Sequence, residues 1–297
     1  MIVTRGLTKR YGRSRGIEDV DLEVDAGEVF GFLGPNGAGK TTTIRLLLGL
    51  LTPTSGTVTV FGLDAHRQRR AVHARLGYLP GDLQLYEHLS ARQQLATFAA
   101  VAGVDTSARV GALAERLQLD LDAPTGSLSR GNRQKVGLVA AFARDTDLYV
   151  LDEPTSGLDP IMQQVFGELV REAAAAGRTV LLSSHQLAEV QRLVDRVAIM
   201  REGRLILVED VGVLRARALR RVELHFAAPV PAEVFAALPG VRVVDGGGER
   251  LRLAVQGPLD AVVKAAARYE VVDLSTQEAD LDEVFLHYYR DTAGVGA

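Results

Sequence analysis

The chain has 297 residues, of which 47% are hydrophobic and 24% are charged, and its formal net charge is −3. This composition is typical of a globular protein of one or two domains, and the near balance of charge argues against nucleic acid as a partner. The sequence contains no cysteine. Disulfides, thiolate metal sites and cysteine nucleophiles are therefore excluded.

The chain shows no pattern of a secretory signal or a membrane span. Met1–Tyr11 carries charges, and no apolar region follows it. The longest apolar stretches, such as Val136–Ala143, fall well short of the about 20 residues that cross a bilayer. If the protein works at a membrane, we expect another polypeptide to cross it.

Short apolar runs alternate with helical patterns along much of the chain. Four runs are expected to be buried strands: Glu28–Leu33, Leu148–Leu151, Thr179–Leu182 and Val197–Met200. Thr41–Leu51 is expected to be a helix. This alternation predicts an α/β fold with a mostly parallel sheet covered on both faces. In such sheets ligands bind beyond the carboxyl ends of the strands, where this chain carries polar residues.

Another helix is expected from Ile161, because the apolar residues Val165, Leu169 and Ala173 recur at every fourth position. Gly177 is placed to end this helix, since glycine readily adopts the left-handed conformation that follows many helices.

Two segments differ from the α/β pattern. Residues 85–144 are rich in Ala, Leu and Arg and lack clear strands, so we expect a helical insert. After about Arg217 the order is β-α-β-β-α-β, that of a ferredoxin-like module. Its elements are expected at Val222–Phe226, Pro231–Leu238, Val241–Val244, Arg250–Val255, Pro258–Tyr269 and Val271–Leu274. The expected domains are residues 1–212 and 218–297.

Residues 34–41 match the phosphate-loop pattern G-x-x-x-x-G-K-[ST]. Glycines let backbone N–H groups approach a triphosphate, and the next helix directs its positive N-terminus at it. Lys40 would reach the β- and γ-phosphates, and Thr41 would hold Mg²⁺ through its hydroxyl. The alternative is a glycine-rich turn without a ligand, but the position between a strand and a helix favours nucleotide binding.

The run Leu148–Leu151 ends in two adjacent acids, Asp152 and Glu153. Neighbouring side chains of a strand point to opposite faces, so the two acids are expected to have different roles. Asp152 would hold Mg²⁺, and Glu153 would act as general base on the attacking water. A helix N-cap is the alternative; the upstream phosphate loop favours the catalytic interpretation.

Taken in order, these motifs resemble those of the nucleotide-binding subunits of ABC transporters over about residues 1–212. Further motifs carry the resemblance: Leu128–Asn132 is similar to the signature loop, usually LSGGQ; Thr155–Pro160 to the D-loop region; His185 to the switch histidine; and Tyr11 to the aromatic residue that stacks on adenine. The tail Leu281–Leu286 resembles that of daunorubicin-resistance export ATPases.

The resemblance implies roles for individual residues. ATP is expected to contact Tyr11, Asn36, Gly37, Ala38, Gly39, Lys40, Thr41, Thr42, Ser129, Gly131 and Asp159. His185 is expected at the γ-phosphate, and Mg²⁺ between Thr41 and Asp152. Ser129 is also a candidate helix N-cap, and both roles are compatible.

The chain departs from the family pattern at two places. Gly81 stands where the family usually has a glutamine that contacts Mg²⁺ and the attacking water, and Asp82 and Gln84 are candidates to replace it. In the signature, Arg130 and Asn132 replace glycine and glutamine, while the residues expected at the γ-phosphate are kept.

The resemblance implies an ATPase that forms a head-to-tail dimer, with itself or with a paralogue. Each ATP is then expected between the phosphate loop of one subunit and the signature segment of the other. The resemblance further implies a separate membrane permease, a position on the cytoplasmic face of the membrane, and export of a drug, antibiotic or lipid-like molecule. An importer ATPase and a soluble ABC ATPase with a non-transport target are the alternatives.

Overall fold

The computed structural model describes residues 1–12, 14–217 and 219–277. The tail expected to resemble export ATPases, Leu281–Leu286, lies outside the described residues. Contacts between residues divide the chain into an N-terminal unit, Met1–Val208, and a C-terminal unit, Glu209–Ala297. The division lies a few residues before the expected boundary at 212.

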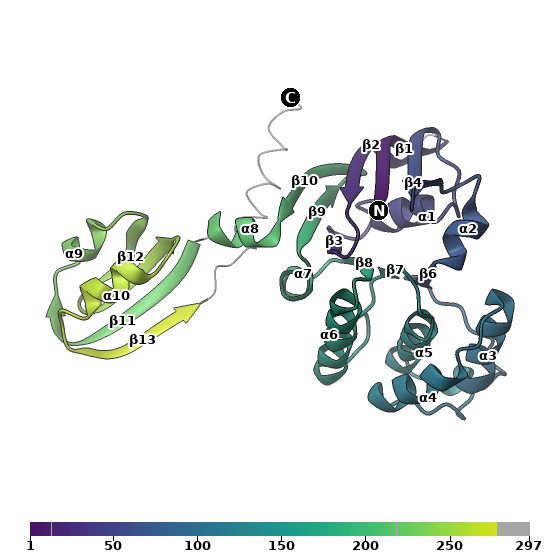
Figure 1. The fold of residues 1–297 in the computed structure, drawn as a ribbon. Coiled ribbons are helices and arrows are strands. Elements are labelled where there is room, and N and C mark those ends of the chain that lie inside the picture. The colour runs from purple at the N-terminus through teal and green to yellow at the C-terminus, as the bar shows by residue number, and fades with distance from the viewer. Residues whose placement is uncertain (13, 218, 278–297) are drawn as a thin grey trace. The chain divides into compact units, whose positions relative to one another are not determined.

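A six-stranded sheet forms the centre of the N-terminal unit (Figure 1), with the order β10-β9-β3-β8-β7-β6. Its strands are β3 (Val29–Leu33), β6 (Leu76–Leu79), β7 (Leu148–Asp152), β8 (Thr179–Ser184), β9 (Arg196–Arg201) and β10 (Arg204–Asp210). The pairs from β9 to β6 are parallel. Every residue of β3, β7 and β8 is buried, which explains why these strands are uninterrupted apolar runs. The four strands expected from the sequence are all present.

A second, four-stranded sheet was not predicted from the sequence. Its order is β2-β1-β4-β5, all antiparallel, with bounds β1 (Ile2–Tyr11), β2 (Ser14–Val24), β4 (Ser55–Val60) and β5 (Leu63–Asp64). Helix α1 (Lys40–Leu47) lies between the two sheets (Figure 1). Phe30, Phe32 and Ile44 are fully buried in their shared core. This packing anchors the start of α1, which the phosphate loop precedes.

Helices α5 (Arg130–Phe142) and α6 (Pro160–Ala175) lie on the opposite face of the six-stranded sheet (Figure 1). The Phe142 ring stacks on Tyr149 of β7 at 4.8 Å between centroids and meets Phe166 edge-on at 6.5 Å. These aromatic contacts hold both helices against the strand that carries Asp152.

The buried face of α6 differs in part from the expected one. Leu169 and Ala173 are buried as predicted, but Ile161 is 64% exposed, and Met162 and Phe166 are buried in place of Ile161 and Val165. Asp159 caps the helix one residue before Pro160. On a helix of about 3.6 residues per turn, each step of four residues drifts by about 40°, so Ile161 lies about 120° round the axis from Ala173. Gly177, with φ of +74°, follows the helix end as expected.

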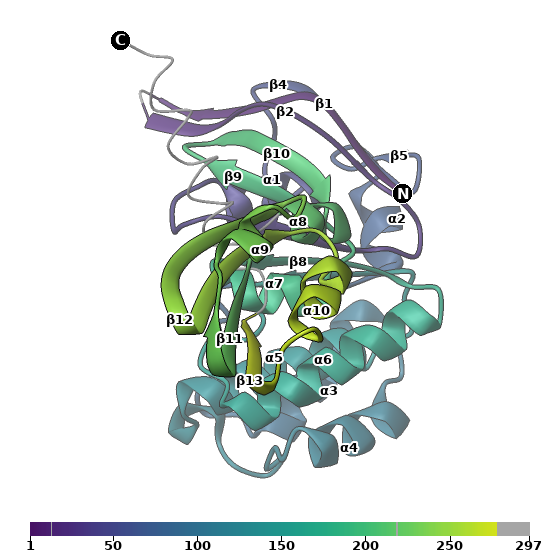
Figure 2. The same ribbon diagram turned by 90° about the vertical axis from the view of Figure 1, so that its left-hand side faces the viewer.

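The segment 85–144 is helical, as expected. It contains α3 (Ala91–Ala102), α4 (Ser107–Arg116), the short 3₁₀ turn η1 (Thr125–Ser127) and α5. Ser90 starts α3 with a capping box closed by Gln93. Figures 1 and 2 both show α3 and α4 at the end of the N-terminal unit farthest from β1 and β2. The remaining helices of this unit are α2 (Arg69–Ala74) and α7 (Leu187–Leu193).

The C-terminal unit contains an antiparallel sheet of order β12-β11-β13. Its elements are α8 (Val211–Arg217), β11 (Leu219–Val230), α9 (Glu233–Ala236), β12 (Val241–Gln256), α10 (Asp260–Ala266) and β13 (Val271–Gln277). The strands expected separately at Val241–Val244 and Arg250–Val255 both lie within β12. Phe226, Phe235 and Val262 share one core, so α9 and α10 cover the same face of the sheet.

We expect Phe166→Ala to lower the free energy of unfolding by about 3–5 kcal/mol, because it empties a fully buried site between α6 and α5. Urea unfolding followed by circular dichroism measures the change. Ile161→Ala, on the exposed side of the same helix, is the control and is expected to change stability by no more than about 0.5 kcal/mol. Equal losses for the two variants would contradict the buried face described above.

Candidate nucleotide-binding site

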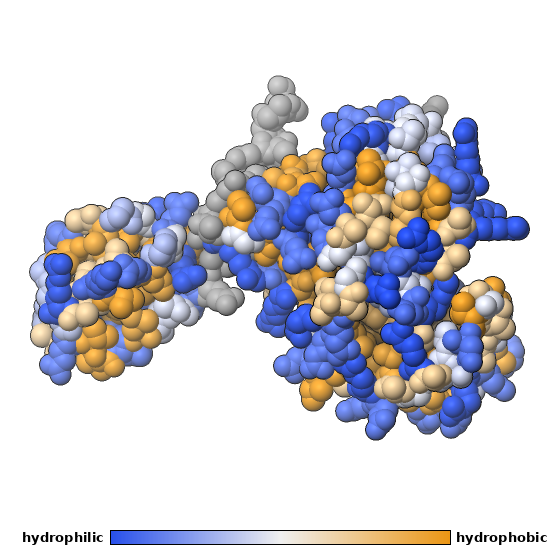
Figure 3. Space-filling view, viewed as in Figure 1, coloured by the Kyte–Doolittle hydropathy of each residue, from blue (hydrophilic) through white to orange (hydrophobic). Residues whose placement is uncertain are grey.

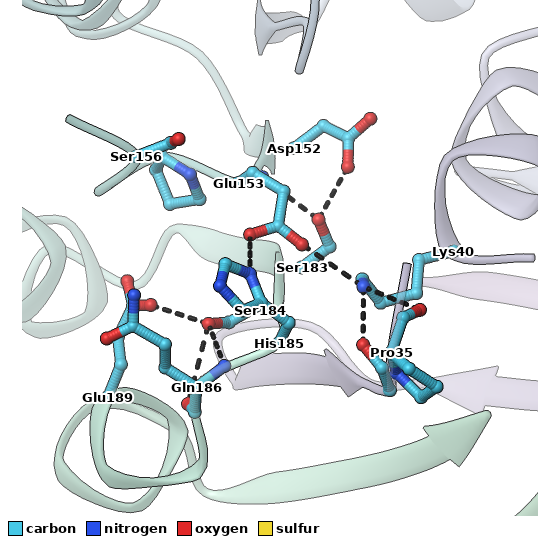
Figure 4. A network of polar contacts seen from close by, with 12 residues as sticks. Pro35, Lys40, Asp152, Glu153, Ser156, Ser183, Ser184, His185, Gln186 and Glu189 are labelled. Atoms are coloured by element: carbon cyan, nitrogen blue, oxygen red, sulfur yellow. Dashed lines mark hydrogen bonds and ion pairs between the residues drawn. The ribbon is translucent and has the colours of Figure 1, made fainter. Parts of the chain in front are cut away.

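Three loops meet at the carboxyl edge of the six-stranded sheet, because they follow the neighbouring parallel strands β3, β8 and β7. The loop after β3 contains the phosphate-loop glycines. Asp152 ends β7 and Glu153 follows it, while Ser183 and Ser184 end β8 and His185 follows them. Figure 4 shows Lys40, Asp152, Glu153 and His185 brought together there. The edge is the position at which α/β sheets bind ligands.

The glycines of the phosphate loop are required by its backbone. Gly37 and Gly39 have φ of +82° and +108°, the left-handed region that glycine tolerates. A Cβ on Gly34 would lie 2.3 Å from the Met200 carbonyl oxygen, whereas a Cβ on Gly37 would meet no described atom within 4 Å. Helix α1 begins directly after Gly39 with no side-chain cap. Its first N–H groups are therefore available to an anion, and the loop fits a polyphosphate.

The neighbouring loop residues differ in exposure. Asn36 is exposed, Thr41 and Thr42 are partly buried, and Ala38 is buried. The structure thus places the expected phosphate-loop residues around one turn at the start of α1.

Lys40 is the buried cation of the site. Its side chain is 6% exposed, and Nζ donates to the Gly34 carbonyl at 2.6 Å and to the Pro35 carbonyl at 3.4 Å. Nζ also lies 3.1 Å from Oε1 of Glu153. A buried ammonium needs such partners to remain charged. The lysine is consequently fixed at the mouth of the phosphate loop, where phosphate oxygens would be its further partners.

Asp152 is fully buried, and only one of its oxygens is paired in the described part of the chain. Oδ1 accepts a hydrogen bond from Ser183 Oγ at 2.5 Å, while Oδ2 is buried without a partner. An unpaired buried carboxylate oxygen is costly. Mg²⁺ usually takes one or two protein ligands together with phosphate oxygens and waters. The Asp152 carboxylate, with the Thr41 hydroxyl, fits that requirement.

Glu153 points to a different side from Asp152, but it follows the last residue of β7, so a turn at Glu153 and not strand alternation separates the two side chains. Its φ is +51°, a left-handed conformation uncommon for glutamate, and this turn directs the side chain toward the loop after β8. His185 Nδ1 lies 2.7 Å from Oε2 of Glu153, opposite the Lys40 contact on Oε1. The glutamate side chain is 22% exposed, so water can reach a carboxylate that two basic residues hold in place (Figure 4).

Ser183 is a site residue to which the sequence analysis assigned no role. Its hydroxyl donates to Asp152 and accepts from the Glu153 backbone N–H at 3.0 Å. Asp152 and Ser183 are register partners in the parallel pair of β7 and β8. The sequence held one signal for this role: Ser183 stands at the end of an apolar strand, as Asp152 does.

The signature segment is packed against the D-loop region of the same chain. Ser129 caps α5 by accepting from the Asn132 N–H at 3.3 Å, so the capping interpretation is correct. Arg130 donates to Ser156 Oγ at 2.6 Å. A Cβ on Gly131 would lie 2.4 Å from the Gly157 carbonyl oxygen. The arginine that departs from the family pattern therefore bridges these two motifs.

Two expected contacts have other partners in the single chain. Asp159 accepts from the Met162 N–H at 2.9 Å and caps α6. Tyr11 is 44% exposed at the end of β1, with Lys9 Nζ 5.5 Å from its ring centroid. Their roles toward ATP stay predictions.

The loop after β6 carries Gly81 in place of the family's glutamine. A Cβ on Gly81 would lie 3.0 Å from Oδ2 of Asp152, so this backbone closes directly on the buried carboxylate. Gln84 Nε2 donates to Asp82 Oδ1 at 2.8 Å, and both side chains line a groove beside the helical insert. In this structure Asp82 and Gln84 pair with each other.

Comparisons with known proteins show the family to which the chain belongs. The family model for ABC transporters matches residues 17–156. The chain belongs to the ABC transporter family, and its enzymatic activity is ATP hydrolysis by an ABC ATPase subunit. Among the described residues, none of the helices combines the length and apolar character needed to cross a bilayer.

The similar proteins are transporter ATP-binding subunits. The chain is 37% identical to the bacitracin transport ATP-binding protein BcrA of Bacillus licheniformis, over 76% of this chain and 74% of that one. It is 36% identical to the daunorubicin resistance ATP-binding protein DrrA3 of Streptomyces coeruleorubidus, over 98% and 96%. A solved ATP-binding subunit of an ABC transporter superposes with a TM-score of 0.67 at 31% identity, over 72% of this chain and 92% of that one.

We expect Lys40→Ala to weaken ATP binding about 10- to 100-fold, because a charge-assisted hydrogen bond contributes about 1.5–3 kcal/mol. Titration with a fluorescent ATP analogue measures the affinity. Lys264→Ala, which removes an exposed lysine of the C-terminal unit, is the matched control. If Lys40→Ala binds ATP with unchanged affinity, residues 34–41 are not the phosphate-binding loop.

Proposed function

We propose that the chain powers export of a small molecule, such as a drug, an antibiotic or a lipid-like compound, through a separate membrane permease. Relatives named for bacitracin transport and daunorubicin resistance match most of the chain, and a Nod factor export ATP-binding protein of Burkholderia lata is 38% identical over 95% of it. In this proposal the protein lies on the cytoplasmic face of the membrane through its permease. The relatives carry the export part of the proposal, and the ATPase part rests on the cluster of buried Lys40 and Asp152 with partly exposed Glu153 at the phosphate loop.

In the proposed mechanism each residue of the cluster has one task. Lys40 and the loop N–H groups would bind the triphosphate, and Thr41 and Asp152 would hold Mg²⁺, which would neutralise phosphate charge when bound. Glu153 accepts the proton of the attacking water at Oε1 or Oε2. His185, 2.7 Å from Glu153, keeps that carboxylate oriented and contacts the γ-phosphate.

We further propose a head-to-tail dimer. The chain carries one phosphate loop and one signature segment, and the observed contacts of the signature residues run to the D-loop region of their own chain. Ser129 and Gly131 are then available to the ATP held by a second copy. A dimeric bacterial ABC transporter cassette has the same fold at 21% identity and a TM-score of 0.65, over 71% of this chain and 99% of that one.

We expect Glu153→Gln to bind ATP but to release phosphate roughly 10²–10⁴-fold more slowly, since the amide cannot accept the proton. The variant should accumulate as an ATP-bound dimer, measured by size-exclusion chromatography with light scattering. Glu168→Gln, at a half-exposed glutamate of α6, is the control and should resemble the unmodified protein. Normal phosphate release by Glu153→Gln would exclude this residue as the base.

The proposed docking site for the permease is a groove of about 480 Å³ beside the helical insert. Apolar side chains from α1, the loop after β6 and α3 line it, including Leu48, Leu83, Leu95, Phe98 and Ala99. In Figure 3 hydrophobic residues reach the surface over α3. An apolar groove of this size suits one amphipathic helix of a partner.

Phe98→Asp is expected to abolish co-purification with the permease while ATP affinity stays within about twofold, because a buried unpaired charge in an apolar interface costs several kcal/mol. The test is co-expression with the permease subunit of the proposed transporter. Val101→Asp is the control, since Val101 lies on the same helix, is 86% exposed and does not line the groove. Retained co-purification by Phe98→Asp would place the permease elsewhere.

We also propose that the C-terminal unit is a ferredoxin-like module. Three observations support it: the sheet order β12-β11-β13, the packing of α9 and α10 in one core, and a hairpin within β12. In that hairpin the Gln256 N–H donates to the Gly240 carbonyl at 2.8 Å, and Gly246 at the turn has φ of +115°. The two halves of β12 then supply the two middle strands of the expected order.

A further inference from the structure

Glu189 is an acidic residue near the site that the mechanism above does not use. It lies in the first turn of α7, which follows β8 in the chain. Ser184 Oγ donates to Glu189 Oε2 at 2.6 Å, and the same hydroxyl accepts from the Gln186 backbone N–H at 2.9 Å. Figure 4 shows Glu189, Ser184 and Gln186 in this chain of contacts on the far side of His185 from Lys40.

The environment of Glu189 is unusual for a helix-capping acid. A glutamate at this position commonly reaches back directly to the N-cap N–H, whereas here the Ser184 hydroxyl stands between the carboxylate and the Gln186 N–H. Ser184 is 1% exposed. Burial raises the pKa of Glu189 above its ordinary value, and the hydroxyls of Ser184 and Thr155 oppose that rise. Partial loss of hydration therefore disfavours the charged carboxylate at this position. Helix capping alone would not require it, because an exposed glutamate could also cap the helix.

We propose that Glu189 is a positioning residue for His185. Ser184 and Gln186 flank the histidine in the chain, and both are tied to the Glu189 carboxylate, one directly and the other through the serine hydroxyl. The inference rests on the roles proposed above for His185 and Glu153.

The geometry gives the reason why His185 needs such support. The His185 side chain is 45% exposed, and its described polar contact is the 2.7 Å approach to Glu153. Packing alone therefore does not fix the ring, and its backbone must be fixed instead. A displacement of about 1 Å at a reacting group can reduce a rate about 100-fold. Loss of the Glu189 tie is expected to loosen the His185–Glu153 contact and to leave the phosphate loop unchanged.

The test is a double-mutant cycle on the full chain, with phosphate release measured against ATP concentration. Glu189→Ala and Ser184→Ala are each expected to lower kcat about tenfold while KM for ATP stays within about twofold. The double variant should be no slower than the slower single variant, because both remove one shared connection. Glu189→Gln, whose amide oxygen can still accept from Ser184, should keep at least about half of kcat. Arg192→Ala, at an exposed residue of α7, is the control.

The proposal is overturned if Glu189→Ala keeps normal kcat, if the two single effects multiply in the double variant, or if Glu189→Gln is as slow as Glu189→Ala. It is also overturned if kcat falls only in proportion to a loss of folded protein measured by thermal unfolding. Glu153→Gln and His185→Ala are measured in parallel. If Glu153→Gln and His185→Ala both turn over ATP normally, the proposed catalytic site is wrong. If both lose turnover and Glu189→Ala keeps a normal kcat, only the positioning role of Glu189 is wrong.

Discussion

The parallel pairing of β7 with β8 sets Asp152 opposite Ser183, and the rest of the site depends on this register. A slip of one residue would turn Asp152 to the other face of the sheet. The Ser183 hydroxyl connects the Asp152 side chain to the Glu153 backbone. The two acids therefore reach different partners although they are adjacent in the chain: Asp152 contacts Ser183, and Glu153 contacts Lys40 and His185.

Charge balance explains why these groups can be buried together. Lys40 is almost fully buried, and Glu153 lies within 3.1 Å of its ammonium. Either residue alone would be costly in that position, because an unpaired buried charge loses its hydration without compensation. ATP adds negative charge at the same place. In the proposed site Lys40 would be shared between Glu153 and the phosphates, so ATP would weaken one of the two contacts that hold the Glu153 carboxylate.

Much of the site could be predicted from the sequence, because its motifs are short and local. The glycine spacing around Lys40 and the acidic end of an apolar strand each predict their own geometry, and parallel strands bring such ends together. The second sheet was harder to predict. The strands β1 and β2 have bulges and mixed burial, so neither shows the strict alternation that identifies a strand. The buried face of α6 was also missed in part, because positions spaced by four residues drift round a helix of about 3.6 residues per turn. The sequence does place Ser183 at a strand end, but its pairing with Asp152 follows from the cross-strand register, which one sequence does not reveal.

The departure at Gly81 follows from the same crowding around Asp152. A glutamine at this position would bring its Cβ to 3.0 Å from Oδ2, which is closer than most carbon contacts. The backbone after β6 would have to move away before a glutamine could reach the metal site. Asp82 and Gln84 are bonded to each other and line the groove beside the helical insert. In this loop the Gly81 backbone therefore lies against the Asp152 carboxylate, and the side chains of Asp82 and Gln84 line the groove. One loop without a glutamine thus joins the proposed permease groove to the buried Asp152 carboxylate.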